Sequence, residues 1–399
     1  NKNTDRLLKA GIKVHLGHNQ KNLKKATMVV TSSAIKNNNN ELVAARKRKL
    51  PIFKRAEMLA NIVALKKNII ITGSHGKTTT TSLVANILVE AGLDPTVING
   101  GVINSLKNTA QLGKGEWAVI EADESDGSFL KLPINYSIVT NIDHEHLDYY
   151  KNFKNLKQAF VKFINKTPPI GKAIVCWDDL NLRKILKTIK IKNYLSYGLH
   201  PNCNYQIFNQ KFSSEFSTFD LKIKNREFKK TIIKRFNLNL LGEHNILNAT
   251  AAIAICLNLG IKINVIKAAL KNFSGVQRRL TKIFVKNHRD FYDDYAHHPT
   301  EIQSVLKGLK QVYKKRKIIS VFQPHRYSRI KQLKKQFASS FILSDVVLLC
   351  PIYAAGEKKD NSYDSNNFAK LIANQSKVQV INIKNELDLN RYLKKKFNF

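Results

Sequence analysis

The stretch from residue 68 to residue 88, NIIITGSHGKTTTTSLVANIL, constrains this chain more than any other. An apolar run typical of a buried strand ends at Thr72, a Gly-Ser-His-Gly turn follows, and a helical pattern begins at Lys77. A glycine-rich turn between a strand and a helix presents backbone N–H groups and the positive end of the helix dipole to one point. The stretch therefore predicts a phosphate-binding loop in an α/β fold.

We expect a nucleotide to contact one continuous run of this loop: Gly73, Ser74, His75, Gly76, Lys77, Thr78 and Thr79. Lys77 is expected to reach the outer phosphates, and the Thr78 hydroxyl to ligate Mg²⁺. The spacing is GxxGKT rather than the common GxxxxGK[ST], because Ile71 stands five residues before Gly76. The prediction of a phosphate-binding loop therefore depends partly on the strand before the turn and the helix after it. Lys77→Ala is expected to abolish turnover and to leave the fold intact.

Acidic side chains follow a second apolar run. The stretch EADESDGSF comes directly after WAVI and supplies Glu121, Asp123, Glu124 and Asp126 in a chain otherwise short of acid. Because ligands of α/β proteins bind at the carboxyl ends of parallel strands, we expect this stretch to face the same nucleotide and to offer carboxylate oxygens to Mg²⁺. A solvated acidic loop is the alternative. It suits Asp126 better than Glu121, which adjoins the apolar run.

Histidines and arginines follow other apolar runs. The stretch TNIDHEHLDYY supplies His144, His146 and Asp148 at a strand end that we expect beside the phosphate loop. Further along, DYAHHPTE supplies Asp293, Asp294, Tyr295, His297, His298 and Glu301, and FQPHRYSR supplies Arg326 and Arg329. The planar fork of arginine suits a carboxylate, so we expect a ligand role for both arginines rather than a surface role.

The charge balance bears on possible partners. The chain holds 67 Lys and Arg against 29 Asp and Glu, a formal net charge of +38. Such an excess suggests an acidic partner, but the lysines are spread along the whole chain and are not interleaved with aromatics as base stacking requires. We therefore expect no nucleic-acid partner. Four cysteines without metal-ligand spacing, and no apolar run approaching about 18 to 20 residues, indicate a cytoplasmic protein without a membrane segment.

Strand-like and helix-like patterns alternate along the chain, which favours α/β architecture with mainly parallel sheets. We expect three domains, at residues 1–66, 67–274 and 275–399. Short strands are expected at IKVHLG, ATMVVTSS and KLPIFKR, antiparallel strands between about Asn202 and Asn239, and one helix through IKQLKKQFASSF. The chain starts with Asn and stops at YLKKKFNF without a closing strand, so we expect pieces to be missing at both ends.

Eight motifs in this order resemble those of the Mur ligases, ATP-dependent ligases of peptidoglycan precursor synthesis. They are TGSHGKTTT, NGG at residues 99–101, EADESDGSFL, TNIDHEHLD, GEHNILNATAA, FSGVQRR, DDYAHHPTE and FQPHRYSR. The resemblance covers essentially the whole chain, and the series is far more specific than any one motif. It implies a truncated Rossmann-like N-terminal domain for a UDP-sugar, a central P-loop ATPase domain, and a Rossmann-like C-terminal domain for an amino acid.

The resemblance also implies a reaction in two steps. The carboxylate of UDP-N-acetylmuramate attacks the γ-phosphate of ATP, and the amine of L-alanine then takes the resulting acyl phosphate. Positioning and charge neutralisation do most of the work in phosphoryl transfer, and domain closure keeps water from the acyl phosphate. ATP and Mg²⁺ are the implied cofactors, and we expect a monomer or a weak homodimer.

By the same resemblance, individual residues have expected roles. Lys77 holds phosphate, Thr78 and Glu121 bind one Mg²⁺, and His146 binds a second. Asn245 and Asn248 meet the adenosine, and Arg279 reaches phosphate when the domains close. The alanine site is lined by Tyr295, His297, Arg326 and Arg329, and the remaining substrate contacts are Ser32, Ser33, Arg55 and Asn99. The implied catalytic set is Lys77, Glu121, His146, Arg279, His297, Arg326 and Arg329.

Departures and rivals remain. The glycine-rich segment that helps seat the uridine diphosphate in this family is not in this sequence. A family member that reattaches recycled murein tripeptide shares most of the motifs, and HHPTE favours L-alanine over that peptide. Folylpolyglutamate synthase is more distant, and DDYAHHP argues against it. Two alternatives come from other protein classes. If the chain were a basic P-loop ATPase that binds nucleic acid, DNA or RNA would stimulate its ATPase activity. If it were a non-catalytic nucleotide-binding regulatory protein, the acidic and histidine clusters would have no function.

Overall fold

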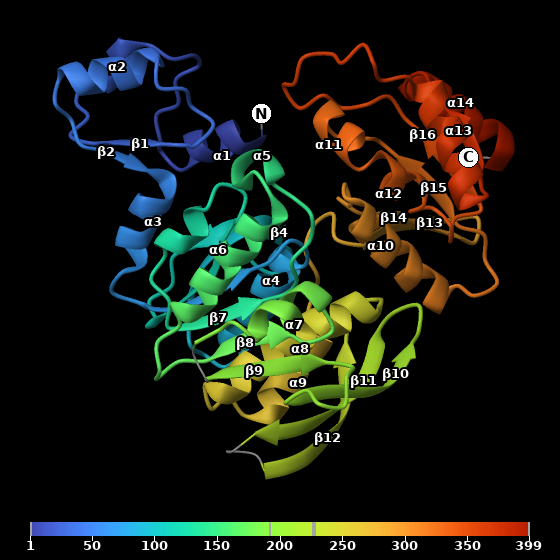
Figure 1. Cartoon of the computed structure of the whole chain (residues 1–399), viewed down its shortest axis with the longest axis horizontal. Helices are drawn as coiled ribbons and strands as arrows, with labels where there is room; N and C mark the ends of the chain where they lie inside the picture. Colours follow the sequence, from blue (N-terminus) through green and yellow to red (C-terminus); the bar gives the residue numbers. More distant parts are fainter. Residues whose placement is uncertain (1, 191–192, 226–228, 398–399) are drawn as a thin grey trace.

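A computed structural model of the chain describes residues 2–190, 193–225 and 229–397 (Figure 1). The N-terminal part lies at the upper left of Figure 1 and the C-terminal part at the upper right, and both adjoin a larger central part. Among the described residues, no helix is both long enough and apolar enough to cross a membrane.

The N-terminal part is small. It comprises α1 (Lys2–Lys9), η1 (Gln20–Leu23), β1 (Val29–Thr31), α2 (Asn40–Lys47), β2 (Ile52–Lys54) and α3 (Arg55–Val63). β1 and β2 lie in ATMVVTSS and KLPIFKR, where the sequence predicts strands, and they pair in parallel. The strand expected at IKVHLG is wrong: the segment has no strand, because Ile12 and Leu16 are exposed and no neighbouring sheet receives their apolar faces.

The central part is built on a ten-stranded sheet in the order β12-β11-β10-β9-β8-β7-β3-β6-β4-β5. β3 (Lys67–Thr72) is buried after its first residue and lies between β6 (Trp117–Glu121) and β7 (Tyr136–Val139), which are both parallel to it. The other strands are β4 (Thr96–Ile103), β5 (Asn108–Gln111), β8 (Ala173–Cys176), β9 (Tyr194–Gly198), β10 (Tyr205–Phe212), β11 (Ser217–Asn225) and β12 (Lys229–Leu238). β10, β11 and β12 pair antiparallel, which confirms the expectation for this section.

The helix that follows β3 is packed between the sheet and two other helices. α4 (Lys77–Glu90) contacts β4 and β6 and also packs on α8 (Glu243–Asn258) and α9 (Ile263–Lys271). Its residues from Thr78 to Ser82 are all buried. A second group of helices comprises η2 (Ser128–Lys131), α5 (Leu147–Tyr150), α6 (Phe153–Asn165) and α7 (Leu180–Leu186). Because α4 is enclosed by the sheet and two helices, the loop at its N-terminus is fixed in place.

The C-terminal part has its own core, in which Phe322, Phe337, Phe341 and Phe368 are buried. A hairpin of β13 (Thr281–Lys286) and β14 (Arg289–Asp293) precedes a parallel sheet of β15 (Ile319–Phe322), β16 (Val346–Leu349) and β17 (Gln379–Asn382). Its helices are α10 (Pro299–Val312), α11 (Tyr327–Gln332), α12 (Lys334–Ala338), α13 (Ser365–Ser376) and α14 (Glu386–Phe397). The single helix expected through IKQLKKQFASSF is divided, because the buried Leu333 leaves helical geometry (φ −115°, ψ 21°).

Candidate active site

The glycine-rich loop runs from the end of β3 to the start of α4. Gly73 (φ 132°) and Gly76 (φ 82°) have left-handed backbone conformations that favour glycine. Both also lack room for a side chain: a Cβ would lie 2.2 Å from Thr140 Oγ1 at Gly73 and 2.5 Å from Asn248 Oδ1 at Gly76. The loop is thus packed between the end of β7 and α8, with α4 behind it. This is the strand–turn–helix geometry of an anion site.

Lys77 lies in a buried ion pair. Its Nζ is 2.9 Å from Glu124 Oε2, and it donates to the carbonyls of Gly73 (2.5 Å) and Ser74 (3.1 Å). Burial alone would lower the pKa of Lys77, but Glu124 and Glu121 outweigh burial and raise that pKa above its usual value. The ammonium therefore stays charged at the mouth of the loop.

Glu121, at the end of β6, faces the first turn of α4. Its carboxylate accepts from the Thr78 hydroxyl at 3.2 Å and from the Gly100 N–H at 2.7 Å. Burial raises the pKa of Glu121, while Lys77 and these hydrogen bonds oppose the rise. Arg279 approaches from the chain beyond α9, with Nη2 at 3.4 Å from Thr78 Oγ1. A hydroxyl and a carboxylate thus meet beside the phosphate loop.

His146 joins the acidic stretch from the next strand end. It caps α5 with a left-handed backbone (φ 57°), and its Nε2 is 3.6 Å from Glu124 Oε1. Burial would lower the pKa of His146, but Glu124 raises it above the usual value. Donor atoms of Asp123, Glu124 and His146 all lie within 4.8 Å of one another. By contrast, His144 stacks on Phe153 with ring centroids 3.7 Å apart.

Residues of the C-terminal part line the same cavity as the phosphate loop. The cavity holds about 620 Å³, and among its lining residues are Lys77, Thr78, Glu121, His146, Arg279, Tyr295, His297 and Arg329. His297 Nδ1 donates to the Tyr295 carbonyl at 2.8 Å, and burial lowers the pKa of His297 to about 4. His297 is therefore neutral at physiological pH, and its Nε2 carries a free lone pair.

Not every expected residue reaches this cavity. Arg326 is outside its lining: its backbone caps α11 (φ 70°) and donates to the Tyr353 carbonyl at 2.9 Å. Arg55 and Asn99 line the cavity, whereas Ser32 does not, and its hydroxyl accepts from the Ala34 N–H at 3.2 Å. Ser33 is also outside the lining. Burial would raise the pKa of Asp126, but Ser128 and, to a smaller extent, Ser33 lower that pKa below its usual value.

A second cavity, of about 490 Å³, lies on the other side of the loop. Asn245 and Asn248 at the start of α8 line it together with Thr79. Both cavities share His75, Gly76, Arg279 and Glu301 in their linings. One elongated ligand that crosses the loop can therefore occupy both.

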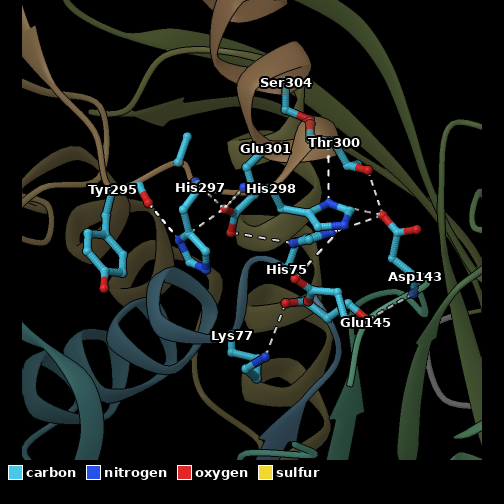
Figure 2. A network of polar contacts seen from close by, with 12 residues as sticks. His75, Lys77, Asp143, Glu145, Tyr295, His297, His298, Thr300, Glu301 and Ser304 are labelled. Carbon is cyan, nitrogen blue, oxygen red and sulfur yellow. Dashed lines mark hydrogen bonds and ion pairs between the residues drawn. The ribbon is translucent and has the colours of Figure 1, made fainter. Parts of the chain in front are cut away.

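Of the four side chains around His75, the sequence singled out His298 and Glu301 but not Asp143 and Glu145. Asp143, Glu145, His298 and Glu301 form a polar network with it that joins the central part to α10 (Figure 2). Two of them, His298 and Glu301, stand in the motif DYAHHPTE, and the other two alternate with the histidines of IDHEH. That alternation of acids with histidines was the available signal.

Fold and site together define a nucleotide-binding α/β enzyme whose phosphate loop faces side chains from a second lobe. Residues 1–67 match the Mur ligase family catalytic domain, 71–256 the Mur ligase middle domain, and 278–394 the Mur ligase glutamate ligase domain. The chain belongs to the Mur ligase family and has its three-domain α/β architecture.

Relatives carry one recurrent name. The chain is 54% identical to a UDP-N-acetylmuramate–L-alanine ligase of Pelagibacter ubique, covering 99% of this chain and 85% of that protein. It is 45% identical to the enzyme of the same name from Brucella anthropi, covering 89% and 76%. The crystal structure of UDP-N-acetylmuramate-alanine ligase from Thermotoga maritima is 28% identical, with a TM-score of 0.79 over 98% of this chain and 84% of that one. A murein peptide ligase of Psychrobacter arcticus, 23% identical with a TM-score of 0.68 over 98% and 85%, shares the fold.

Proposed function

We propose that the protein joins L-alanine to the carboxylate of UDP-N-acetylmuramate and converts ATP to ADP and phosphate, in peptidoglycan precursor synthesis. One observation carries the proposal: Lys77 and Glu121 of the central part line one cavity with His297 and Arg329 of the C-terminal part. A site for phosphoryl transfer and a site for an amino acid thus share one space. The names and identities of the relatives support the same reaction.

In the first step, a carboxylate oxygen of UDP-N-acetylmuramate attacks the γ-phosphorus of ATP, the bond to the β–γ bridging oxygen breaks, and ADP leaves. The backbone N–H groups of the loop and the Lys77 ammonium stabilise the transferred charge, because they are fixed before the reaction. Arg279, 3.4 Å from Thr78, is a second cation for the same phosphates. Asn245 and Asn248 would hold the adenosine in the adjoining cavity.

The donor set fits Mg²⁺. The Thr78 hydroxyl and the Glu121 carboxylate are hard oxygen ligands 3.2 Å apart. Near His146, donor atoms of Asp123, Glu124 and His146 lie within 4.8 Å of one another. We propose that Thr78 and Glu121 hold one ion and that His146 contributes to a second beside Glu124. The bound ions would neutralise phosphate charge.

In the second step, the L-alanine nitrogen attacks the acyl carbon, the carbon–oxygen bond to phosphate breaks, and the amide forms. Arg329 is the proposed partner of the alanine carboxylate, since its guanidinium lines the cavity. The amine must shed protons before it attacks. Neutral His297 suits this task, because its Nδ1 is committed to the Tyr295 carbonyl and its Nε2 remains an acceptor.

Other parts of the proposal depend more on the resemblance. We propose domains at residues 1–66, 67–274 and 275–399, with Arg55 and Asn99 on the sugar-nucleotide side. Ser32, Ser33 and Arg326 stay predictions, and for Arg326 a contact with L-alanine needs a side-chain or lobe movement, since it lies outside the cavity lining. A cytoplasmic location, where ATP is available, and a monomeric or weakly dimeric state are further proposals.

The test is ADP release by the full-length protein. With ATP, Mg²⁺ and UDP-N-acetylmuramate present, L-alanine is expected to stimulate release far more than glycine, L-serine or the murein tripeptide. Each acceptor is omitted in turn as a control. Stimulation by the tripeptide and not by L-alanine would assign the protein to cell-wall recycling instead, and ADP release driven by DNA or RNA would refute the ligase proposal.

A further inference from the structure

The side chain of His75 lies in the phosphate loop but faces the C-terminal part (Figure 2). The backbone of His75 belongs to the loop: its N–H donates to Asn141 Oδ1 at 2.7 Å, and its carbonyl accepts from Thr140 Oγ1 at 2.6 Å. The imidazole is 12% exposed, and its two nitrogens contact two acids. Backbone and side chain of this residue therefore have separate partners.

The two acids come from different parts of the chain. His75 Nε2 is 3.1 Å from Asp143 Oδ2, at the end of the β7 segment, and Nδ1 is 3.4 Å from Glu301 Oε1, in the first turn of α10. The Thr300 hydroxyl of α10 also donates to Asp143 Oδ2 at 2.5 Å. The imidazole thus bridges the central part and α10 directly beside the phosphate loop.

The charges of this cluster favour a cation at its centre. Burial alone would lower the pKa of His75, but the adjacent carboxylates of Asp143 and Glu301 outweigh burial and raise that pKa to about 10. The neighbouring His298, whose ring centroid is 4.8 Å away, has its pKa lowered by burial and by the charge of His75 to about 3. One imidazolium therefore lies between two carboxylates, with Glu145 and Arg279 as the next charged groups.

Glu301 links this bridge to the reacting groups. One of its oxygens faces His75, and the other accepts the backbone N–H groups of His297 (3.0 Å) and His298 (3.3 Å). The segment that carries Tyr295 and His297 into the cavity is thus held by the same carboxylate that the phosphate loop binds. A short chain of contacts runs from the loop through His75 and Glu301 to His297.

We propose that His75 is a positioning residue that clasps α10 to the phosphate loop and so sets His297 over the acyl phosphate for attack by the amine. This inference rests on the proposed ligase function. Without the imidazolium, Asp143 and Glu301 face each other across the lobes, and the cation nearest to Glu301 is Arg279 at 3.9 Å. Loss of the clasp should therefore weaken the use of L-alanine more than the binding of ATP, which the loop backbone performs.

The test compares His75→Gln, Glu301→Gln and the double variant in the full-length protein. His75→Gln is expected to lower kcat/KM for L-alanine at least about tenfold and to change the KM for ATP less than about threefold, because a buried, hydrogen-bonded charge pair is broken. The fold-decrease in kcat/KM for L-alanine in the double variant should be smaller than the product of the two single fold-decreases, since both single variants remove the same interaction. His15→Gln, an exposed histidine of the N-terminal part, is the control expected to match the wild type.

Small-angle scattering gives a readout that does not need turnover. With a non-hydrolysable ATP analogue and UDP-N-acetylmuramate, His75→Gln should be more open than the wild type, with a larger radius of gyration. A wild type without L-alanine-dependent ADP release would refute the proposed function, while the scattering still judges the clasp. Equal compactness of variant and wild type, or a KM for ATP that rises as much as that for L-alanine, would overturn the clasp. If His75→Gln alone does not fold, the double variant takes its place in the scattering comparison. It also lacks the Glu301 carboxylate, so Asp143 no longer faces a second unpaired charge.

Discussion

Replacing Lys77 should destabilise the central part, and the size of the loss follows from its partner. Glu124 has a fully buried side chain, and besides Lys77 the structure places His146 Nε2 3.6 Å from its carboxylate. Removing one member of a buried ion pair costs about 3–5 kcal/mol. A second route gives the same size: protonating a carboxyl of ordinary pKa, about 4.3, at pH 7.5 costs about 4.4 kcal/mol, at about 1.36 kcal/mol per pH unit. The sequence alone predicts that the fold stays intact, and the buried ion pair adds the prediction that the variant is measurably less stable.

The two tryptophans of the chain make this loss measurable. Trp117 in β6 and Trp177 after β8 both belong to the central part, so urea unfolding followed by their fluorescence reports on that part alone. Lys77→Met is expected to lower the free energy of unfolding of the central part by about 4 kcal/mol at pH 7.5. At pH 5.0 the expected loss is only about 1 kcal/mol, because protonating Glu124 costs less free energy there.

Two companion variants separate the ion pair from other effects. Lys77→Met with Glu124→Gln should regain at least about half of the loss, because no buried charge is left unpaired. Lys154→Met, an exposed lysine of α6, should change the free energy of unfolding by less than about 0.5 kcal/mol. A Lys77→Met loss below about 1 kcal/mol at pH 7.5, or a loss that is the same at both pH values, would refute the reasoning.

Three other predictions concern the metal, the amino acid and pH. Glu121→Gln should raise the Mg²⁺ concentration needed for half-maximal ADP release, and an unchanged magnesium titration would place the ion elsewhere. Arg329→Lys should raise the KM for L-alanine about tenfold with little change for ATP, because a point charge replaces a planar fork. The pKa of His75 is raised from 6.5 to about 10, so its contribution to stability is complete below about pH 6.5 and is lost as pH rises through about 10. The pKa values of Asp143 and Glu301 are lowered from 3.8 and 4.5 against their burial, so their contribution is present above about pH 4.5 and is lost as pH falls. Thermal unfolding should therefore occur at the highest temperature between about pH 4.5 and pH 6.5, and a steady rise towards pH 10 would contradict this assignment.

The sequence predicted the features that follow from local chemistry. The loop after β3 needs glycine at residues 73 and 76, and this requirement is visible as a motif. Glu121 ends β6 and His146 follows β7, the two parallel strands on either side of β3, so both residues lie at the edge of the sheet where the phosphate loop begins. Local pattern failed at IKVHLG, because alternation of apolar residues makes a strand only where a sheet accepts it.

Features that depend on the relative placement of lobes were not predictable in this way. The contact between His75 and Glu301 joins residues 226 positions apart, and no periodicity encodes how closely two lobes approach. The same holds for Lys77 and Glu124, since the sequence offers four acids in one stretch and only packing selects the buried one. Arg326 and Arg329 look equivalent in FQPHRYSR, yet one turn of helix separates a residue in the cavity lining from one outside it.

The central claim is that the carboxylate of the sugar nucleotide is activated as an acyl phosphate before the amine attacks. If both oxygens of that carboxylate carry ¹⁸O, one must pass to phosphate when the amide forms. Mass spectrometry of the phosphate released with ATP and L-alanine should therefore find one ¹⁸O atom per turnover. Phosphate without ¹⁸O, formed together with the amide, would contradict the account.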